Sequence, residues 1–333
     1  MAQFSITLQS VVNLASTHAD LLPLAGVGGY TQEPALSLCN DALSDLVSFG
    51  NDWKFNSQDM GLLVTAPNRQ EYIFAGASAF TLGSNPSGAC IDLASNSAIT
   101  QNGFVTTVKT TQPHRFKVGD VVYMIGNTVD AYNSIFTDDG ISSKWSGGWI
   151  ITAVTANSFT FTHSQSGLAA SGAPGITDFS WLESATMVEM TSTSSPQRIV
   201  PLQAVKEIQP WSRVADPEKV SVYRDNNDGT LTIRFWWVPG STLWGAGLVY
   251  QKAAPTKTDL TGDWSPFPDH YAAVYRQALI YRMYRFVNSP RADAEYQKLQ
   301  VEIQKAKGAD DSEASDIHLC PEEGSLMDDG FWG

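Results

Sequence analysis

The sequence has few cysteines and no long apolar run. Its three cysteines, Cys39, Cys90 and Cys320, stand far apart and never at CxxC spacing, which favours reduced thiols over a disulfide framework. No stretch approaches the roughly 18 to 20 consecutive apolar residues that a membrane helix requires. The first residues also lack the basic region of a signal peptide. We therefore expect a soluble protein that is not exported and has no membrane partner.

The patterns that carry catalysis or metal binding are also missing. None of the five histidines pairs with a His, Cys or acid at ligand spacing, and no GxSxG, HExxH or Walker loop occurs. The loop Asp225 to Gly229 invites a calcium interpretation, but Thr230 and Trp236 stand where an EF-hand needs Gly and Glu. A β-hairpin turn fits that loop better. We predict no enzyme activity, no catalytic residue, no metal site and no cofactor.

Basic residues are absent from one end of the chain. The net charge is −13, yet residues 309–333 contain eight acids and no Lys or Arg. The other 308 residues carry 26 acids and 21 bases, a net charge of only −5. Specific or tight binding to nucleic acid by counterion release needs clustered cations, so we exclude it. Such a chain could still surround DNA that has to slide past.

What the sequence does contain is an α+β pattern. Apolar residues at helical spacing predict a helix over 34–49, which begins at Pro34 and stops before Gly50. Asp269 is expected to cap a second helix over 269–287, with an apolar face from Tyr271 to Phe286. Ser289 and Pro290 start a third helix that ends at Gly308, with a buried stripe of Ala292, Tyr296, Leu299 and Ile303. The three helices should form a bundle. The first 33 residues give no clear pattern.

Between the helices, short runs of Val, Ile, Thr, Phe and Tyr alternate with turn residues and predict β structure from about residue 60 to 250. Residues 100–175 differ in composition and end in a Gly/Ala/Ser-rich stretch from Ser166 to Gly175, so we interpret them as an inserted small β-sandwich-like domain. The predicted division is 1–99 (first helix and strands), 100–175 (insert), 176–263 (β-rich body), 264–308 (helical hairpin) and 309–333 (acidic extended tail).

Two groups of side chains could meet a ligand. The aromatic residues Phe235, Trp236, Trp237 and Trp244, or Trp145 with Trp149, could stack on sugars or bases, although packing within sheets or at a subunit interface is the better interpretation. The arginines of the helical hairpin could meet DNA phosphates, but they are spread around the helix and lie near many acids. We favour ion pairs with a neighbouring chain for Arg276, Arg282, Arg285 and Arg291.

Several of these segments together resemble the head-to-tail adaptor (connector) proteins of tailed bacteriophages, a group that includes the podovirus tail tubular protein A. The resemblance rests on the order of helix 34–49 with Trp53, the strand 184–189, Trp264 to Asp269 leading into the helix of Tyr275, and Asn288 to Arg291. It covers roughly residues 30–60 and 180–308. The inserted domain and the acidic tail lie outside it.

The resemblance implies a non-catalytic virion protein made in the host cytoplasm. It also implies a ring of twelve subunits in the neck between head and tail, with the portal protein above and a tail or nozzle protein below. Double-stranded DNA would pass through the lumen without specific binding during ejection. The interface residues that we predict are Arg276, Arg282, Arg285, Phe331 and Trp332.

The acidic tail is low in apolar content and is expected to be disordered when alone. It would become ordered against the portal or a neighbouring subunit by burying Phe331 and Trp332. A different class of function remains open, which is a tail-associated protein that binds carbohydrate or a receptor through the tryptophans of the β-rich part. A glycan-cleaving enzyme has only scattered acids in its favour.

Overall fold

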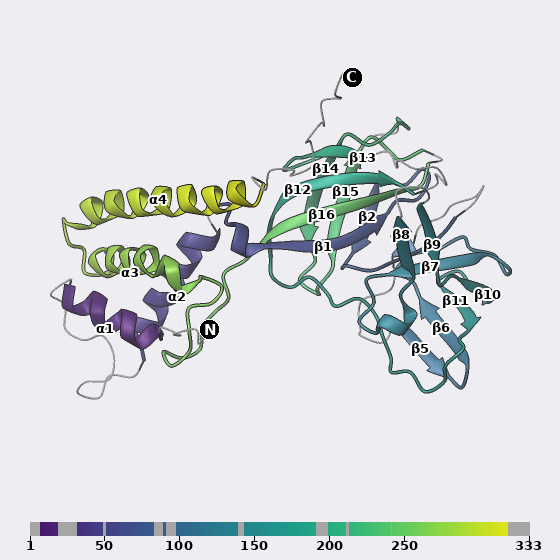
Figure 1. Ribbon diagram of the computed structural model, residues 1–333, viewed down its shortest axis with the longest axis horizontal. Helices are drawn as coiled ribbons and strands as arrows, with labels where there is room; N and C mark the ends of the chain where they lie inside the picture. Colours follow the sequence, from purple (N-terminus) through teal and green to yellow (C-terminus); the bar gives the residue numbers. More distant parts are fainter. Residues whose placement is uncertain are drawn as a thin grey trace, which may run out of the picture. The chain divides into compact units, whose positions relative to one another are not determined.

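The computed structural model describes residues 7–18, 32–48, 51–82, 89–90, 98–138, 143–190, 199–210, 213–240 and 242–318. The chain divides into two compact units, one made of residues 1–56 and 253–333 and the other of residues 57–252. The first is helical and the second is built from β-strands (Figure 1). The α+β fold class is confirmed, and so is a bundle of the early helix with a C-terminal helix pair.

The helical unit contains four α-helices among the described residues. They are α1 (Leu8–His18), α2 (Ala35–Ser48), α3 (Ala272–Phe286) and α4 (Ala292–His318), with short 3-10 turns at Lys54–Asn56 and Asp269–Tyr271. Helix α3 packs against each of the other three, and α4 runs along it in Figure 1. None of these helices has the length and apolarity to cross a bilayer.

The core of this unit follows the predicted helical faces. In α2, Cys39, Leu43, Leu46 and Val47 are buried. Trp53 is also buried, and its indole nitrogen donates a hydrogen bond of 2.8 Å to the carbonyl oxygen of Leu46 at the end of α2. The predicted apolar face of α3 and of the turn before it is also buried. Its buried residues are Tyr271, Val274, Tyr275, Ala278, Leu279 and Met283. Phe286, predicted to continue this face, is 57% exposed instead.

Three details of the helical hairpin differ from the prediction. Asp269 does not cap α3, because a 3-10 turn over Asp269–Tyr271 comes first and no side chain bonds at its start. Ser289 does accept a hydrogen bond of 3.3 Å from the backbone N–H of Arg291, as expected of an N-cap. Helix α4 continues past Gly308 to His318. Tyr296 is 43% exposed rather than buried, because α4 packs through Leu299, Ile303 and Ala306.

The β unit contains two seven-stranded sheets among its described residues. The first has the strand order β1-β16-β12-β13-β14-β15-β2, antiparallel except for β13 beside β14. Its strands are β1 (Ser57–Val64), β2 (Glu71–Phe74), β12 (Phe179–Glu189), β13 (Ile199–Ala204), β14 (Lys219–Asp225), β15 (Leu231–Trp236) and β16 (Trp244–Lys252). The turn at Asp228 and Gly229 joins β14 to β15, as predicted.

The second sheet contains most of the segment that we interpreted as an insert. Its order is β4-β3-β7-β10-β11-β6-β5, and a separate ribbon pairs β8 with β9. The strands are β3 (Ser78–Thr81), β4 (Ala89–Cys90), β5 (Ile99–Asn102), β6 (Val105–Lys109), β7 (Val121–Ile125), β8 (Ile135–Asp138), β9 (Ser143–Ser146), β10 (Trp149–Val154) and β11 (Ser158–Thr162). Phe159 and Phe161 point into its core, as the alternation in β11 predicts. The five-part domain division stays a prediction.

Three glycines meet where the chain passes from one sheet to the other. Gly61, Gly76 and Gly126 all have positive φ angles, of 93°, 97° and 77°. A Cβ atom on Gly126 would lie 1.9 Å from the carbonyl oxygen of Gly76, and one on Gly61 would lie 2.9 Å from it. Only glycine fits such a close backbone approach.

Candidate interface on the helical unit

The predicted interface arginines lie on different faces of α3. Arg276 and Arg285 are nine residues apart, so they point to opposite sides of a helix with 3.6 residues per turn. Arg282 faces α2. The structure therefore confirms that these side chains are spread around the helix and do not form one cationic patch. Phe331 and Trp332 lie outside the described residues.

The guanidinium of Arg282 is engaged within the chain. It donates hydrogen bonds to both carboxylate oxygens of Asp45, and it lies 3.6 Å from a carboxylate oxygen of Asp41. The hydrogen bond to Asp45 raises the pKa of Arg282 above its ordinary value. Both side chains are only about one-fifth exposed. This pair joins α2 to α3, and an interface role for Arg282 stays a prediction.

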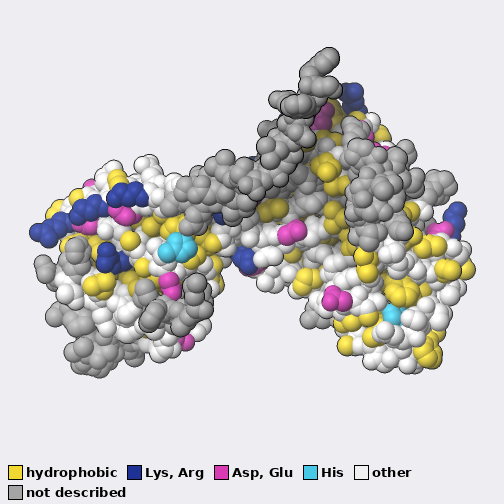
Figure 2. Space-filling view, in the orientation of Figure 1, with side chains coloured by type: hydrophobic (Ala, Val, Ile, Leu, Met, Phe, Trp, Pro, Cys, Tyr) yellow, Lys and Arg dark blue, Asp and Glu magenta, His cyan; other side chains and the backbone are white. Residues whose placement is uncertain are grey.

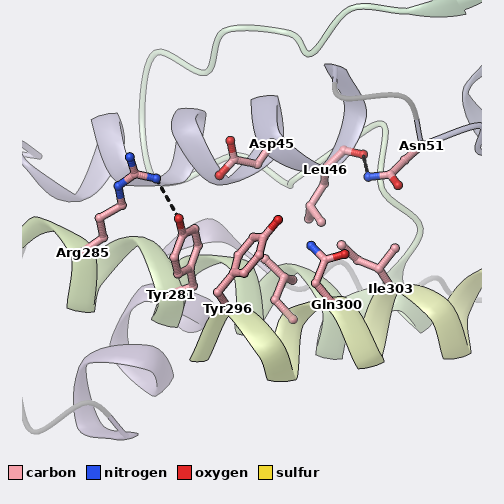
Figure 3. A pocket seen from close by; sticks show the side chains of 9 residues that line it. Asp45, Leu46, Asn51, Tyr281, Arg285, Tyr296, Gln300 and Ile303 are labelled. Atoms are coloured by element: carbon pink, nitrogen blue, oxygen red, sulfur yellow. Dashed lines mark hydrogen bonds between the residues drawn. The ribbon is translucent and has the colours of Figure 1, made fainter. Parts of the chain in front are cut away.

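Arg285 borders a groove of about 610 Å³ between α2, α3 and α4, which we call the tyrosine groove (Figure 3). Its guanidinium donates a hydrogen bond of 2.7 Å to the hydroxyl of Tyr281. The ring of Tyr281 in turn lies 5.3 Å from that of Tyr296, centroid to centroid. The groove is lined by Asp45, Leu46, Asn51, Tyr281, Arg285, Tyr296, Leu299, Gln300 and Ile303.

The tyrosine groove has the composition of a protein interface. Tyr and Arg are enriched where proteins meet, because they present large areas with few rotors or planar arrays of donors. Here Tyr281 and Arg285 come from α3 and Tyr296 comes from α4 (Figure 3). The groove holds no nucleophile next to a general base. It suits recognition of another chain better than catalysis.

Arg276 belongs to a second groove on the other flank of α4, which we call the basic groove. Two adjoining hollows of about 520 and 580 Å³ share Ala273 and Arg276. The basic groove is lined by Ser10, Val11, Leu14, Trp264, His270, Ala272, Ala273, Arg276, Gln277, Gln297, Lys298, Val301, Glu302 and Lys305. Tyr296 was predicted to lie in a buried stripe, and Lys298 and Lys305 were not singled out from the sequence. The 298–305 spacing of two helical turns was the available signal for the two lysines.

The histidines and acids of the β unit have structural roles. His114 and His163 are buried, and in each ring one nitrogen accepts a backbone N–H while the other lies about 3 Å from a carbonyl oxygen. Asp225 and Asp228 accept hydrogen bonds from residues of their own turn, and the bond from the Thr230 hydroxyl lowers the pKa of Asp228. No group of three or more metal-binding side chains occurs within the described ranges.

The aromatic clusters of the β unit mostly pack inward. Phe235 and Trp244 are buried, so they are not available to stack on a sugar. Trp149 stacks on Phe161 at 5.0 Å, and Trp145 meets Phe80 edge to face at the same centroid distance. The packing interpretation is therefore confirmed for these four side chains.

Comparison with known proteins agrees with this picture of a recognition protein. The model of the SU10 adaptor protein family matches residues 145–318, just over half of the chain. The match runs from β9 to the end of α4, and so it includes α3 and α4 and all four hairpin arginines. It does not include α2, on which part of the sequence resemblance rested. No curated protein matches the chain.

The family points to a structural role in the virion and not to an enzyme. The sequence resemblance and the family match agree on this point, and the α+β fold with its helical bundle is the architecture that the resemblance implied. The chain belongs to the SU10 adaptor protein family and is a phage head-to-tail adaptor.

Proposed function

We propose that the chain forms a ring of twelve subunits beneath the portal, joins the capsid to a tail or nozzle protein below, and lets double-stranded DNA pass through its lumen. Family membership supports the adaptor role. The observation that carries the ring is the presence of two unlike grooves on the helical unit. They flank α4, with Tyr296 and Gln300 on one side and Gln297 and Val301 on the other.

A closed ring requires two different surfaces on each subunit. In a heterologous contact, one patch of a subunit meets another patch of its neighbour, and the contact repeats until the circle closes. The tyrosine groove and the basic groove differ in charge, so each can receive a different surface of a neighbouring subunit. In this arrangement Arg285 and Arg276 contact different neighbours, which fits their positions on opposite faces of α3.

The charge of the chain supports passage of DNA without tight binding. A net charge of −13 gives little counterion release on contact with a duplex, since that release needs several clustered cations. The cations of α4 are interleaved with Asp293, Glu295 and Glu302. The lumen of a ring of such chains would repel DNA phosphates or bind them only weakly, so DNA could slide during packaging and ejection.

Negative-stain microscopy of the purified protein, alone and mixed with the portal of the same phage, tests this proposal. We expect rings, or extra ring-shaped density on the portal, and a twelvefold average. Arg285→Glu should weaken ring formation because it places a carboxylate beside Tyr281 and Asp45. Lys117→Glu, an exposed substitution outside both grooves, is the control.

Two results would overturn the proposal. The first is a chain that stays monomeric and never adds density to the portal at micromolar concentration. The second is a monomer that instead binds polysaccharide, which would point to a receptor-binding tail protein. A monomer in solution that adds to the portal as a ring supports the proposal, because assembly can require the portal as a template.

A further inference from the structure

The basic groove combines an apolar floor with a cationic rim. Leu14 of α1 is 51% exposed and Val301 of α4 is 49% exposed, and both line the groove together with Ala273. Around them stand three cations, Arg276, Lys298 and Lys305, against a single lining carboxylate, Glu302. Figure 2 shows Lys and Arg side chains gathered along the side of the helical unit where α4 lies.

Arg276 is the least satisfied of these cations. Lys298 and Lys305 each reach a carboxylate on their own helix at 2.8 Å, but Arg276 forms no hydrogen bond or ion pair with any residue that the structure describes. It projects from the point where the two hollows of the groove join. An exposed guanidinium with five free donors beside an apolar floor suits an acidic peptide that also carries large apolar side chains.

The chain itself contains a segment with this chemistry. Residues 319–333 carry four acids and no Lys or Arg, and pairs of acids alternate with pairs of apolar residues. In order along the chain the pairs are Glu322 and Glu323, Leu326 and Met327, Asp328 and Asp329, and Phe331 and Trp332. The acids complement the rim of the basic groove, and the apolar pairs complement its floor. Phe331 and Trp332 are the kind of aromatic anchor that dominates peptide docking.

The direction of α4 favours the groove of another copy. The last residue of α4 that lines the basic groove is Lys305, and the helix continues to His318. At about 1.5 Å per residue this carries the chain roughly 20 Å beyond the groove. A segment that follows His318 would have to reverse direction to fill the groove of its own chain. In a ring, the same segment can continue onto the next subunit.

We propose that the basic groove of one copy binds the acidic segment 319–333 of a second copy, with Arg276 and Lys305 on its carboxylates and Phe331 and Trp332 on the Leu14, Ala273 and Val301 floor. The inference rests on the proposed ring, since it uses a heterologous contact between subunits. It assigns the basic groove an occupant and gives the acidic segment a role in assembly.

Disulfide trapping in the full-length chain tests this contact. A tagged chain carries Gln297→Cys in the basic groove and an untagged chain carries Gly333→Cys, both with Cys90→Ser and Cys320→Ser. On oxidation of the mixture, we expect a disulfide between the tagged and the untagged chain. Gln300→Cys, three residues further along α4 but in the tyrosine groove, is the matched control. It should give at least tenfold less product.

Charge reversal adds a second measurement. Arg276→Glu with Lys305→Glu should lower the trapped fraction about tenfold at low salt, since two attractive contacts become repulsive. Lys117→Glu, an exposed substitution in the β unit, should leave it unchanged. Melting curves of each variant show whether the fold is retained, because all three positions are exposed.

The outcomes separate this inference from the ring proposal. Rings in the microscope without a Gln297 disulfide between chains would overturn the inference and leave the ring standing. A disulfide that joins only two tagged chains or only two untagged chains would overturn it as well. Absence of rings together with an interchain Gln297 disulfide would instead overturn the ring and keep the contact between two copies.

Discussion

Arg282 of α3 donates hydrogen bonds to both carboxylate oxygens of Asp45 on α2 through its Nε and one terminal nitrogen. The two residues are separated by 237 positions in the sequence, and the whole β unit lies between them along the chain. The pair therefore fastens the early helix to the C-terminal hairpin. A bidentate contact of this kind specifies the angle between two helices as well as their distance.

Replacing the bidentate guanidinium of Arg282 with a lysine ammonium should destabilise the helical bundle. Arg282→Lys keeps the positive charge but cannot donate two parallel hydrogen bonds, so we expect a loss of about 1 to 2 kcal/mol in the free energy of unfolding. Arg291→Lys is the control, because Arg291 is exposed and its side chain forms no ion pair within the described residues. Urea unfolding measures both, and equal midpoints for the two variants would contradict the prediction.

The meeting point of Gly61, Gly76 and Gly126 in the β unit, which we call the glycine junction, gives a second test of stability. Gly126 and Gly167 share a φ of 77°, but a Cβ on Gly126 would meet the carbonyl oxygen of Gly76 at 1.9 Å while one on Gly167 would meet nothing within 4 Å. Gly167→Ala should cost only the backbone strain, about 1 kcal/mol. Gly126→Ala should cost more than about 4 kcal/mol, or prevent folding. Thermal melting decides, and similar melting temperatures would show that the junction can open.

The spacing of apolar residues along the sequence predicted the helices and strands that bury one face. Helices α2 and α3 show this, and so does β11 with Phe159 and Phe161 inside. Helix α1 was missed although Leu8, Val11, Val12 and Ala15 form a buried stripe. Its first two N–H groups bond to the carbonyl oxygens of Gly262 and Leu260. That support comes from the other end of the chain. Local signals were also present, because the stripe has helical spacing and the Thr7 hydroxyl accepts a hydrogen bond of 3.3 Å from the backbone N–H of Ser10.

The candidate interface was only partly predictable for the same reason. The arginines of α3 can be read from the sequence, but the partner of Arg282 lies 237 residues away. Tyr296 was expected in the core because it continues the spacing of Leu299 and Ile303. In the structure Glu295 takes the buried position instead, since Gln277 of α3 donates to its carboxylate. A polar contact between two helices overrode a hydrophobic pattern.

Cys39 provides a test of the core at alkaline pH. Burial raises the pKa of its thiol from 9.0 to about 11. Because the folded-state pKa is the higher one, this contribution is fully present below pH 9 and is lost as the pH rises toward 11. Cys39→Ala should remove it, so the difference in unfolding free energy between parent and variant should shrink by roughly 2 to 3 kcal/mol across that window. A constant difference from pH 8 to 11 would contradict the assignment.

The thiol should also resist modification. With Cys90 and Cys320 replaced by Ser, a thiol reagent at pH 8 should label Cys39 at the rate of unfolding, because only a thiolate that reaches solvent reacts. The unfolded chain in urea, whose thiol has its ordinary pKa, is the reference. Rapid labelling in the native state would show that α2 opens away from Tyr275, whose hydroxyl donates a hydrogen bond of 3.2 Å to the Cys39 carbonyl oxygen.

Helix α4 contains two ion pairs of identical spacing that should differ in importance. Glu295 accepts from Lys298, and Glu302 accepts from Lys305, both at 2.8 Å. Glu295 is 8% exposed at its side chain and also accepts a hydrogen bond of 2.7 Å from Gln277 on α3, whereas Glu302 is 33% exposed and has no second helix as partner among the described contacts.

Removing the two carboxylates should therefore have unequal effects. Glu295→Ala removes the carboxylate that accepts from the half-buried amide of Gln277, which keeps only its bond of 3.2 Å to the Glu295 carbonyl oxygen. We therefore expect a loss of about 1 to 2 kcal/mol. Glu302→Ala removes only an exposed pair on one helix and should cost about 0.5 kcal/mol or less. Raising the salt to 1 M should weaken the second effect further, because exposed pairs are screened and buried hydrogen bonds are not. If chemical denaturation gave the same loss for both, the α3–α4 contact at Glu295 would contribute nothing beyond its surface ion pair.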